Sequence, residues 1–288
     1  MAAAISPLRR IQIQAPEVIP LSPGDVDSLR LPNRRAVEQT RRAIIRRPGR
    51  SVWIPETLEF LVIGSWRNRP EISSIEDFEA IRNVEPLVRE AAERAFAQHD
   101  ELLLAVELEA SSSRSRFERA GMELLEEVIT YEIDAARVPR MPQKHLRLVS
   151  ISPHDTAAVD RVVALDQAAF PWLWRNSRAE FEVYLDSPGV SVSFLVRGGM
   201  PVAYVGSTLF PGWGHLDRIA VAPELQGQGL GRSALILAID SLRQQGARRV
   251  GLSTQRTNLR SQRLYDRFGF RRTPDLDYRL FGLWSDRR

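Results

Sequence analysis

The stretch LDRIAVAPELQGQGLGRSALILAID, residues 216–240, decides the fold of this chain. Its apolar run ends at Pro223, because proline cannot donate a hydrogen bond to a strand ladder. Gly227, Gly229 and Gly231 then precede an Ala/Leu/Ile-rich segment that is typical of a helix. Glycine permits positive φ and a close approach to the main chain, and the first N–H groups of a helix have no intrahelical partners. The stretch therefore predicts a strand, a tight turn and a helix whose N-terminus can hold a phosphate.

Around this stretch, proline, glycine and apolar periodicity divide the chain of 288 residues. Residues 1–35, with five prolines, are expected to form an irregular lead-in. Strands and helices then alternate over residues 36–140, where we expect a helix over residues 115–125. The sequence VPRMPQ, residues 138–143, reads as a linker to a second unit at residues 141–288. This order predicts an α/β protein with a mixed sheet and helices on both faces.

Composition excludes several classes of function. There are no cysteines and only four histidines, which argues against disulfides, a thiol nucleophile and a metal site. No apolar run has the length of about 20 residues that spans a bilayer, and the N-terminus lacks a signal-peptide core. We therefore expect a cytoplasmic protein without membrane contact. The net charge is only +4, and its basic excess lies in residues 1–50, which we interpret as a solvated arm and a helix (AVEQTRRAIIRR) rather than a nucleic-acid-binding segment.

Two motifs at the expected separation carry a resemblance to a known family. The strand HLDRIAV followed by Q-x-x-G-x-G, and the later NLRSQRLYDRFGF, resemble the GNAT superfamily of acyl-CoA-dependent N-acyltransferases. The resemblance covers residues 146–284 and implies a mostly antiparallel, splayed sheet with helices on both faces. It also implies acetyl-CoA as co-substrate, without a metal. A primary amine of a small molecule, or of a peptide or protein N-terminus, would be the acceptor, and a homodimer stays open.

The resemblance assigns the coenzyme A site residue by residue. Main-chain groups of the strand would pair with the pantetheine arm as an added strand does, since an open strand edge offers unpaired N–H and C=O groups. The glycine-rich turn would wrap the pyrophosphate. The residues so implied are Ile219, Ala220, Val221, Gln226, Gly227, Gln228, Gly229, Leu230, Gly231, Arg232 and Asn258.

The chemistry implied is attack of an amine on a thioester. In the family a tyrosine at the position of Tyr265 commonly donates to the departing sulfur, and a phenol with a pKa of about 10 keeps its proton. Strand alternation places His215, Asp217, Ile219 and Val221 on one face. His215 or Asp217 would assist deprotonation of the amine, because an unperturbed histidine titrates at about pH 6.5. Aromatic packing for Tyr265 and strand capping for His215 are the structural alternatives.

Fewer sequence features indicate which residues bind the acceptor amine. AAFPWLW and the C-terminal motif resemble ribosomal-protein N-terminal alanine acetyltransferases, but Ser253 stands where those proteins carry a catalytic glutamate. Phe170, Trp172, Trp174 and Trp213 either wall an acceptor site or simply pack. An alternative function is a module of the same fold that senses acyl-CoA or docks a partner without turnover.

The first half repeats the second at a shift of 148 residues, which matches Leu104 with Leu252 and Gly121 with Gly269. Phe117 replaces the tyrosine of the C-terminal motif. Phe78, Ile81 and Asn83 replace the glutamine and two glycines of the turn. We therefore expect residues 36–140 to be a partial, degenerate acyltransferase-like lobe; the alternative is a chance match of two helix–strand units.

Overall fold

The computed structural model describes residues 16–108, 115–140 and 145–285. Within them, the strands form one sheet of 13 strands, in the order β1-β2-β3-β4-β5-β13-β6-β11-β10-β9-β8-β7 with β12 beside β6. The elements are β1 (Ile19–Pro20), η1 (Asp25–Ser28), α1 (Arg34–Arg46), β2 (Val52–Ile54), β3 (Glu59–Ser65), η2 (Trp66–Asn68), β4 (Ile72–Glu79), α2 (Val84–Ala97), β5 (Leu102–Leu108), α3 (Arg116–Arg119), β6 (Glu123–Asp134), η3 (Ala135–Arg137), β7 (Leu146–Ser150), α4 (Thr156–Ala169), η4 (Trp172–Trp174), α5 (Arg178–Leu185), β8 (Val190–Arg197), β9 (Met200–Phe210), β10 (Trp213–Val221), η5 (Pro223–Leu225), α6 (Leu230–Gln244), β11 (Arg249–Gln255), α7 (Leu259–Phe268), β12 (Arg271–Arg272), η6 (Pro274–Leu276) and β13 (Tyr278–Trp284).

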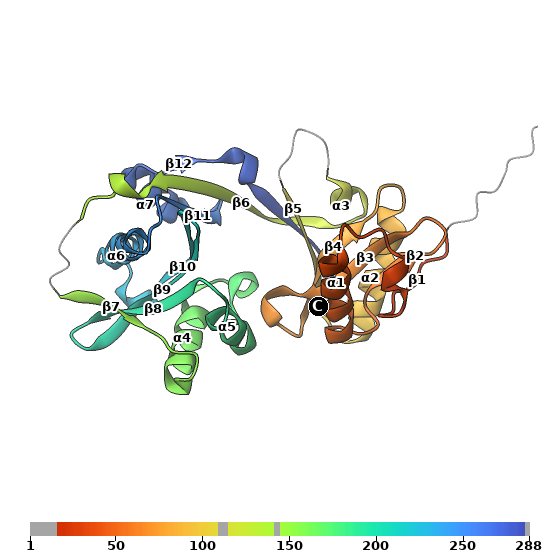
Figure 1. Cartoon of the computed structure of the whole chain (residues 1–288), viewed down its shortest axis with the longest axis horizontal. Coiled ribbons are helices and arrows are strands. Elements are labelled where there is room, and N and C mark those ends of the chain that lie inside the picture. Colours follow the sequence, from red (N-terminus) through yellow and green to blue (C-terminus); the bar gives the residue numbers. More distant parts are fainter. Residues whose placement is uncertain (1–15, 109–114, 141–144, 286–288) are drawn as a thin grey trace, which may run out of the picture.

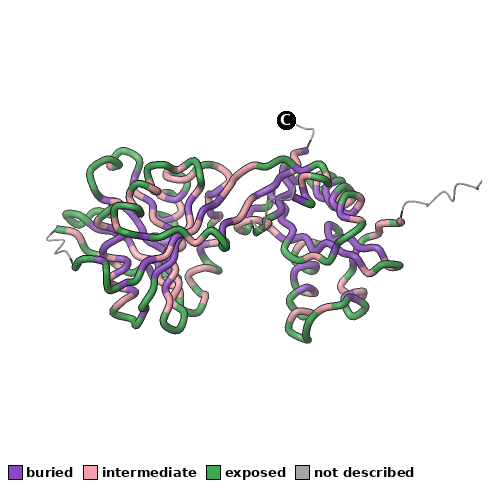
Figure 2. Tube along the Cα trace, turned by 90° about the horizontal axis from the view of Figure 1, so that it is seen from above, coloured by how far each residue is buried: buried purple, intermediate pink, exposed green. Residues whose placement is uncertain are grey.

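The sheet is shared by two lobes that lie side by side (Figure 1). In the C-terminal lobe, α6 and α7 pack on one face of the sheet, and α4 and α5 pack on the other. Each lobe has its own buried interior, as the two purple regions of Figure 2 show. Among the described strand pairs only β4–β5 and β10–β11 are parallel, which confirms the predicted mixed, mostly antiparallel sheet with helices on both faces.

The two lobes exchange strands near the middle of the sheet. The C-terminal strand β13 lies between β5 and β6, and β6 in turn pairs with β11 of the C-terminal lobe. Figure 1 shows β6 running from one lobe into the other. The halves are therefore joined by continuous backbone ladders as well as by side chains. The division of the chain into a degenerate unit at residues 36–140 and a catalytic unit at residues 141–288 stays a prediction.

In both lobes the parallel pair separates part-way along its length. Pairing of β10 with β11 ends at Leu216↔Leu252, and pairing of β4 with β5 ends at Ser74↔Leu104. The repeat matches Leu104 with Leu252, so both lobes open after the equivalent residue. The N-terminal lobe thus contains the expected partial copy of the C-terminal fold.

A β-bulge in β10 corrects the prediction that four side chains share one face. The register with β9 shifts between Leu216 and Arg218, so that Asp217 is the extra residue. Asp217 contacts α5, whereas Ile219 and Val221 pack on the α6 side. His215 and Asp217 therefore lie on the face opposite to Ile219 and Val221.

In the N-terminal lobe, a carboxylate of the chain itself occupies the turn that leads into α2. Oε1 of the buried Glu59 accepts hydrogen bonds from the N–H groups of Ile81 at 2.7 Å, Arg82 at 2.8 Å and Asn83 at 3.3 Å. Burial alone would raise the pKa of Glu59, but these bonds and the Asn83 amide outweigh it and lower the pKa to about 2. Ile81 matches Gly229 in the repeat. Where the C-terminal lobe is expected to hold a phosphate, the N-terminal lobe holds Glu59.

We predict that Glu59→Gln destabilises the N-terminal lobe. The lowering of the pKa from 4.5 to about 2 corresponds to about 3 kcal/mol of folding free energy at neutral pH. Because the folded-state pKa is the lower one, this contribution is present above about pH 4.5 and is lost as the pH falls toward about 2. Urea unfolding of wild type and of Glu59→Gln should therefore give a difference in unfolding free energy that becomes smaller as the pH is lowered from 7 toward 2.

The matched control is Glu56→Gln, which changes an exposed carboxylate in the preceding turn. Amide hydrogen exchange over residues 80–84 locates the effect, since their N–H groups should lose protection only in Glu59→Gln. An equal loss of stability in both variants would contradict the role of the Glu59 carboxylate.

Three local expectations differ from the structure. The helix expected over residues 115–125 ends at Arg119, because Gly121 at φ 88° ends it and β6 begins at Glu123. The strand β4 was not expected, since its sequence ISSIEDFE lacks an apolar run. In the expected linker, Val138 is buried in the core of the C-terminal lobe, and residues 141–144 lie outside the described ranges.

Candidate active site

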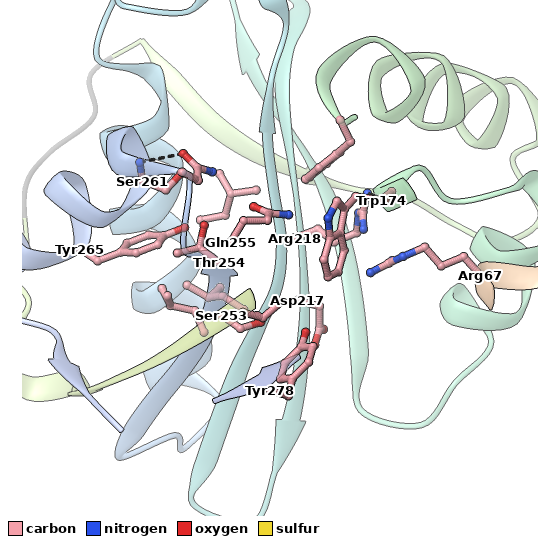
Figure 3. A pocket seen from close by; sticks show the side chains of 16 residues that line it. Arg67, Trp174, Asp217, Arg218, Ser253, Thr254, Gln255, Ser261, Tyr265 and Tyr278 are labelled. Atoms are coloured by element: carbon pink, nitrogen blue, oxygen red, sulfur yellow. Dashed lines mark hydrogen bonds between the residues drawn. The ribbon is translucent and has the colours of Figure 1, made fainter. Parts of the chain in front are cut away.

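The separation of β10 from β11 opens a cleft of about 100 Å³ that is continuous with solvent. Figure 3 shows side chains that enter it from both lobes. Of the predicted site residues, the cleft brings together Asp217, Ile219, Asn258 and Tyr265. The lining residues are Arg67, Val128, Phe170, Trp174, Leu216, Asp217, Arg218, Ile219, Leu252, Ser253, Thr254, Gln255, Asn258, Ser261, Tyr265 and Tyr278.

One edge of β10 has no strand partner along the cleft. Pairing with β9 continues to Val221↔Ala203, whereas pairing with β11 has ended at Leu216↔Leu252. The edge of residues 219–221 that faces β11 therefore offers main-chain N–H and C=O groups to an extended amide. The Ala220 side chain is buried on the α4 side, so only its backbone is available to such a ligand.

The glycine-rich turn leaves the N-terminus of α6 open. Gly227 at φ 89° and Gly229 at φ 78° adopt left-handed conformations, and a Cβ built on either would meet nothing within 4 Å. Gly229 is the N-cap and makes no side-chain capping bond. By contrast, Asn33, Asp155, Ser177 and Asn258 cap α1, α4, α5 and α7 with their side chains. The first N–H groups of α6 thus have room for an anionic partner.

Around this turn the other predicted side chains are held at the surface. Arg260 donates to Gln226 at 2.8 Å, and Arg197 donates to Gln228 at 3.3 Å. The guanidinium of Arg232 lies 5.7 Å from the ring centre of Phe268. Leu230 is buried and anchors the first turn of α6, while Gly231 faces Val221 without a close contact.

Tyr265 lies on α7 with its hydroxyl at the cleft. Its ring packs against Tyr131 and Phe270, with centroid distances of 5.7 Å in both cases. Burial raises the pKa of Tyr265 to about 12, and the nearby Ser261 hydroxyl opposes this only in part. The phenol therefore keeps its proton throughout the physiological range. Asn258 caps α7 by accepting from the Ser261 N–H at 3.1 Å, the dashed line in Figure 3, and its amide nitrogen remains a donor.

Asp217 holds the centre of a hydrogen-bonded group behind the cleft. One carboxylate oxygen lies 2.6 Å from Nδ1 of His215, and the other accepts from the Thr208 hydroxyl at 2.7 Å and from the Tyr184 hydroxyl. Burial and the Asp217 charge raise the pKa of Tyr184, which keeps that hydroxyl a donor. Asp217 lines the cleft, but His215 does not. Asp217 therefore faces the cleft, and His215 lies behind it.

Two of the four predicted aromatic side chains line the cleft. Phe170 and Trp174 do so, and the ring of Phe170 packs against the guanidinium of Arg218 at 3.9 Å. Trp172 instead packs against Trp284 with a centroid distance of 5.7 Å. Trp213 lies outside the lining and stacks on the imidazole of His215, 5.5 Å away. The prediction that Trp172 and Trp213 could wall the site is therefore not supported by the geometry.

Sequence reasoning missed three lining residues that other parts of the chain contribute. Arg67 comes from η2 of the N-terminal lobe, and Val128 and Tyr278 come from the exchanged strands β6 and β13. No local pattern signals such contributions. Arg218 was missed for a different reason. A charged residue inside an apolar strand indicates a buried ion pair rather than a cleft residue, and Arg218 both pairs with Asp166 and lines the cleft.

Two further features were sought among the described residues, a cluster of metal-ligating side chains and a membrane-spanning helix. Within the described ranges, no three His, Asp or Glu side chains come together as a metal site. The described helices include none with the length and hydropathy that crossing a bilayer requires.

Comparison with known proteins identifies the class of the C-terminal lobe. Residues 159–270 match the family model described as the acetyltransferase (GNAT) family, so this lobe carries a GNAT acetyltransferase domain. A curated relative from Bacillus subtilis (strain 168) is 26% identical over 111 residues, which are 38% of this chain and 73% of that protein. Its name proposes it as a ribosomal protein bS18-alanine N-acetyltransferase.

Solved structures extend the similarity in fold to both lobes. A GCN5-related N-acetyltransferase from Sphaerobacter thermophilus is 16% identical, with a TM-score of 0.62 over 93% of this chain and 95% of that chain. A tandem GNAT protein from the clavulanic acid biosynthesis pathway is 17% identical, with a TM-score of 0.57 over 93% and 98%. The two-lobed arrangement therefore recurs among known GNAT structures.

Proposed function

We propose that the C-terminal lobe transfers an acetyl group from acetyl-CoA to a primary amine of a small molecule or of a peptide or protein N-terminus. One observation carries this proposal: the open edge of β10 lies beside the uncapped N-terminus of α6. The backbone of residues 219–221 would hold the pantetheine arm, and residues 226–232 would hold the pyrophosphate. Asn258 would donate to the arm from its free amide nitrogen.

Acetyl-CoA, when bound, supplies a thioester carbon for attack by the amine. An amine with a pKa of about 10.4 is almost wholly protonated at neutral pH, and freeing it costs about 4 to 5 kcal/mol. The Asp217 carboxylate, with His215 behind it, would draw off this proton. As the C–N bond forms and the C–S bond breaks, the Tyr265 hydroxyl would donate a hydrogen bond to the sulfur that receives the electron pair.

A protein acceptor is supported by the name of the Bacillus subtilis relative, which concerns the alanine of a ribosomal protein. Ser253, in place of the glutamate of that group, lines the cleft and contacts the hydroxyl of the half-buried Tyr278. The proton acceptor of this chain would therefore differ, which leaves both small molecules and N-termini as acceptors.

The alternative is a module that binds acyl-CoA without turnover. The retained phenol of Tyr265 favours catalysis, because the degenerate lobe has the buried Phe117 at the matching position. Binding alone would not require a hydroxyl there.

Two measurements on the full chain test the proposal. We expect calorimetry to give saturable binding of acetyl-CoA with one site, since Glu59 occupies the matching turn of the other lobe. We expect release of free coenzyme A thiol when a panel of amines and N-terminal peptides is added. Absence of acetyl-CoA binding would overturn the whole proposal, and binding without thiol release on any acceptor would favour the sensor.

A further inference from the structure

A turn of the N-terminal lobe docks into the active-site side of the C-terminal lobe. Trp66 donates from Nε1 to the Leu173 carbonyl at 2.7 Å, and Asn68 donates to Glu180 at 2.6 Å. Arg67 donates from Nη1 to the Asn176 side chain at 2.6 Å. The turn is thus fixed to η4 and to the start of α5, and it carries one side chain into the cleft.

The backbone of this turn is strained. Arg67 at φ 53° and Asn68 at φ 49° both adopt left-handed conformations without being glycine. Such a conformation is unfavourable for a non-glycine residue, and it persists only where the surroundings impose it. Here the imposed conformation directs a guanidinium into the neighbouring lobe.

Arg67 is a cation without an ion pair in the described part of the chain. Its Nε atom is buried and has no hydrogen-bond partner among the described residues, and the bond to Asn176 uses only Nη1. The carboxylates of Glu180 and Asp166 act on Arg67 electrostatically. Glu180 already accepts a hydrogen bond from Asn68, and Asp166 forms an ion pair with Arg218. An enclosed charge without a counter-charge is unfavourable unless a partner arrives.

The surroundings make this charge available to a ligand. Burial and the neighbouring Arg218 lower the pKa of Arg67 to about 10, so the guanidinium stays charged at neutral pH. It stands 5.1 Å from the ring centres of both Trp66 and Trp174, which exclude water from its sides. In Figure 3, Arg67 and Tyr265 enter the cleft from opposite sides, with Asp217 between them.

We propose that Arg67 binds a carboxylate of the acceptor, so that the acceptor is an amine that also carries an acid group. This inference rests on the proposed function and names the substrate class of that same cleft. Asp217 faces the ammonium end of such a molecule, and Arg67 faces its carboxylate end. The aromatic rings of Phe170 and Trp174 flank the carbon chain between them.

A carboxylate fits better than a neutral or a doubly charged group. Nη2 and the second hydrogen of Nη1 form a planar pair of donors that matches the two oxygens of a carboxylate. One monoanion balances the charge of Arg67, since Arg218, the other arginine among the described residues that line the cleft, is paired with Asp166. A phosphate dianion would add negative charge beside Asp217, and a neutral acceptor would leave Arg67 uncompensated.

The test compares amino acids with their carboxamides on the full chain. The probes are β-alanine, γ-aminobutyrate and longer homologues, each beside the carboxamide of equal length. Calorimetry is done on protein saturated with coenzyme A, and kcat/KM is measured with acetyl-CoA. For the best-fitting length, wild type should prefer the acid by roughly 10-fold or more, since a charge-assisted bond replaces a neutral one.

Arg67→Met keeps the stem between the two tryptophans and removes the charge, so the preference should fall to roughly 2-fold or less. The Kd for acetyl-CoA should not change. Arg67→Lys keeps the charge without the planar fork and should give an intermediate preference. Arg178→Met is the matched control, because it removes an arginine at the start of α5 that is outside the cleft and paired with Asp160 and Glu182.

The outcomes separate the two proposals. Equal binding of acids and carboxamides by wild type, or an unchanged preference in Arg67→Met, overturns the role of Arg67 while acetyl transfer can still stand. An Arg67-dependent preference for acids in the calorimetry, with no acetyl transfer at all, supports the role of Arg67 and overturns the proposed function. If neither variant folds, the wild-type comparison can still overturn the proposal, because equal binding of acids and carboxamides excludes a carboxylate site.

Discussion

Replacing Gly229 by glutamate is expected to weaken acetyl-CoA binding by more than about 100-fold. A carboxylate roughly 5 Å from a diphosphate charge adds about 3 kcal/mol of repulsion at an effective dielectric constant near 20. The new side chain would also take the N–H groups at the start of α6 for itself. A related arrangement occurs in the N-terminal lobe, where Glu59 from β3 accepts from the N–H of Ile81, the residue that matches Gly229, at 2.7 Å.

Two further variants isolate the cause of this loss. Gly246→Glu places the same residue at φ 100° in the turn after α6, again with nothing within 4 Å, so it reproduces strain and charge at the opposite end of the helix. Gly229→Ala reproduces the strain at φ 78° without the charge. Calorimetry should give near-normal affinity for Gly246→Glu and a modest loss for Gly229→Ala. Retained affinity in Gly229→Glu would show that the pyrophosphate lies elsewhere.

The local pattern of residues 216–240 was sufficient to predict the strand, the turn and the helix of the C-terminal lobe. Each of these depends on neighbours in sequence: Pro223 ends the pairing, and Gly229 adopts the left-handed conformation that starts α6. The repeat was also readable, because Leu104 and Leu252 end their parallel pairings at equivalent places.

The missed features all depend on partners that are distant in sequence. The exchange of β6 and β13 joins strands whose pairing has no local signature, so Val128 and Tyr278 could not be assigned to the site. The bulge at Asp217 inserts one residue into an otherwise regular alternation, which reverses the face of everything after it. Arg67 lies on a turn whose target is another lobe, and its sequence context WRNR resembles any polar turn.

Removing one hydroxyl, in Tyr265→Phe, is expected to lower kcat by about 100-fold or more while leaving the Kd for acetyl-CoA within about 2-fold. Positioned proton donors of this kind contribute typically 10²- to 10⁴-fold to a rate. Packing should survive, because the ring contacts with Tyr131 and Phe270 do not involve the hydroxyl. Single-turnover measurement of thiol release separates this effect from slow product release.

The role of Tyr265 also has a signature in the pH dependence. Since burial raises its pKa to about 12, the phenol stays protonated and should add no alkaline limb to the wild-type profile below that pH. A thiol has a pKa of about 8.5, so full proton transfer from so weak an acid is uphill and the contribution is a hydrogen bond to the developing charge. Acetyl thioesters with a more acidic leaving thiol need that bond less. The difference between Tyr265→Phe and wild type should therefore shrink with such donors.

Tyr131→Phe is the matched control, because Tyr131 packs against the same ring but does not line the cleft. It removes a phenol hydroxyl from the same cluster and should change kcat by less than about 3-fold, since typical single hydrogen-bond losses away from the reacting atoms act on stability. Equal activity of Tyr265→Phe and wild type would show that Tyr265 serves only to pack the core. The hydrogen bond to the leaving sulfur would then have to come from water or from another hydroxyl that lines the cleft, such as that of Tyr278.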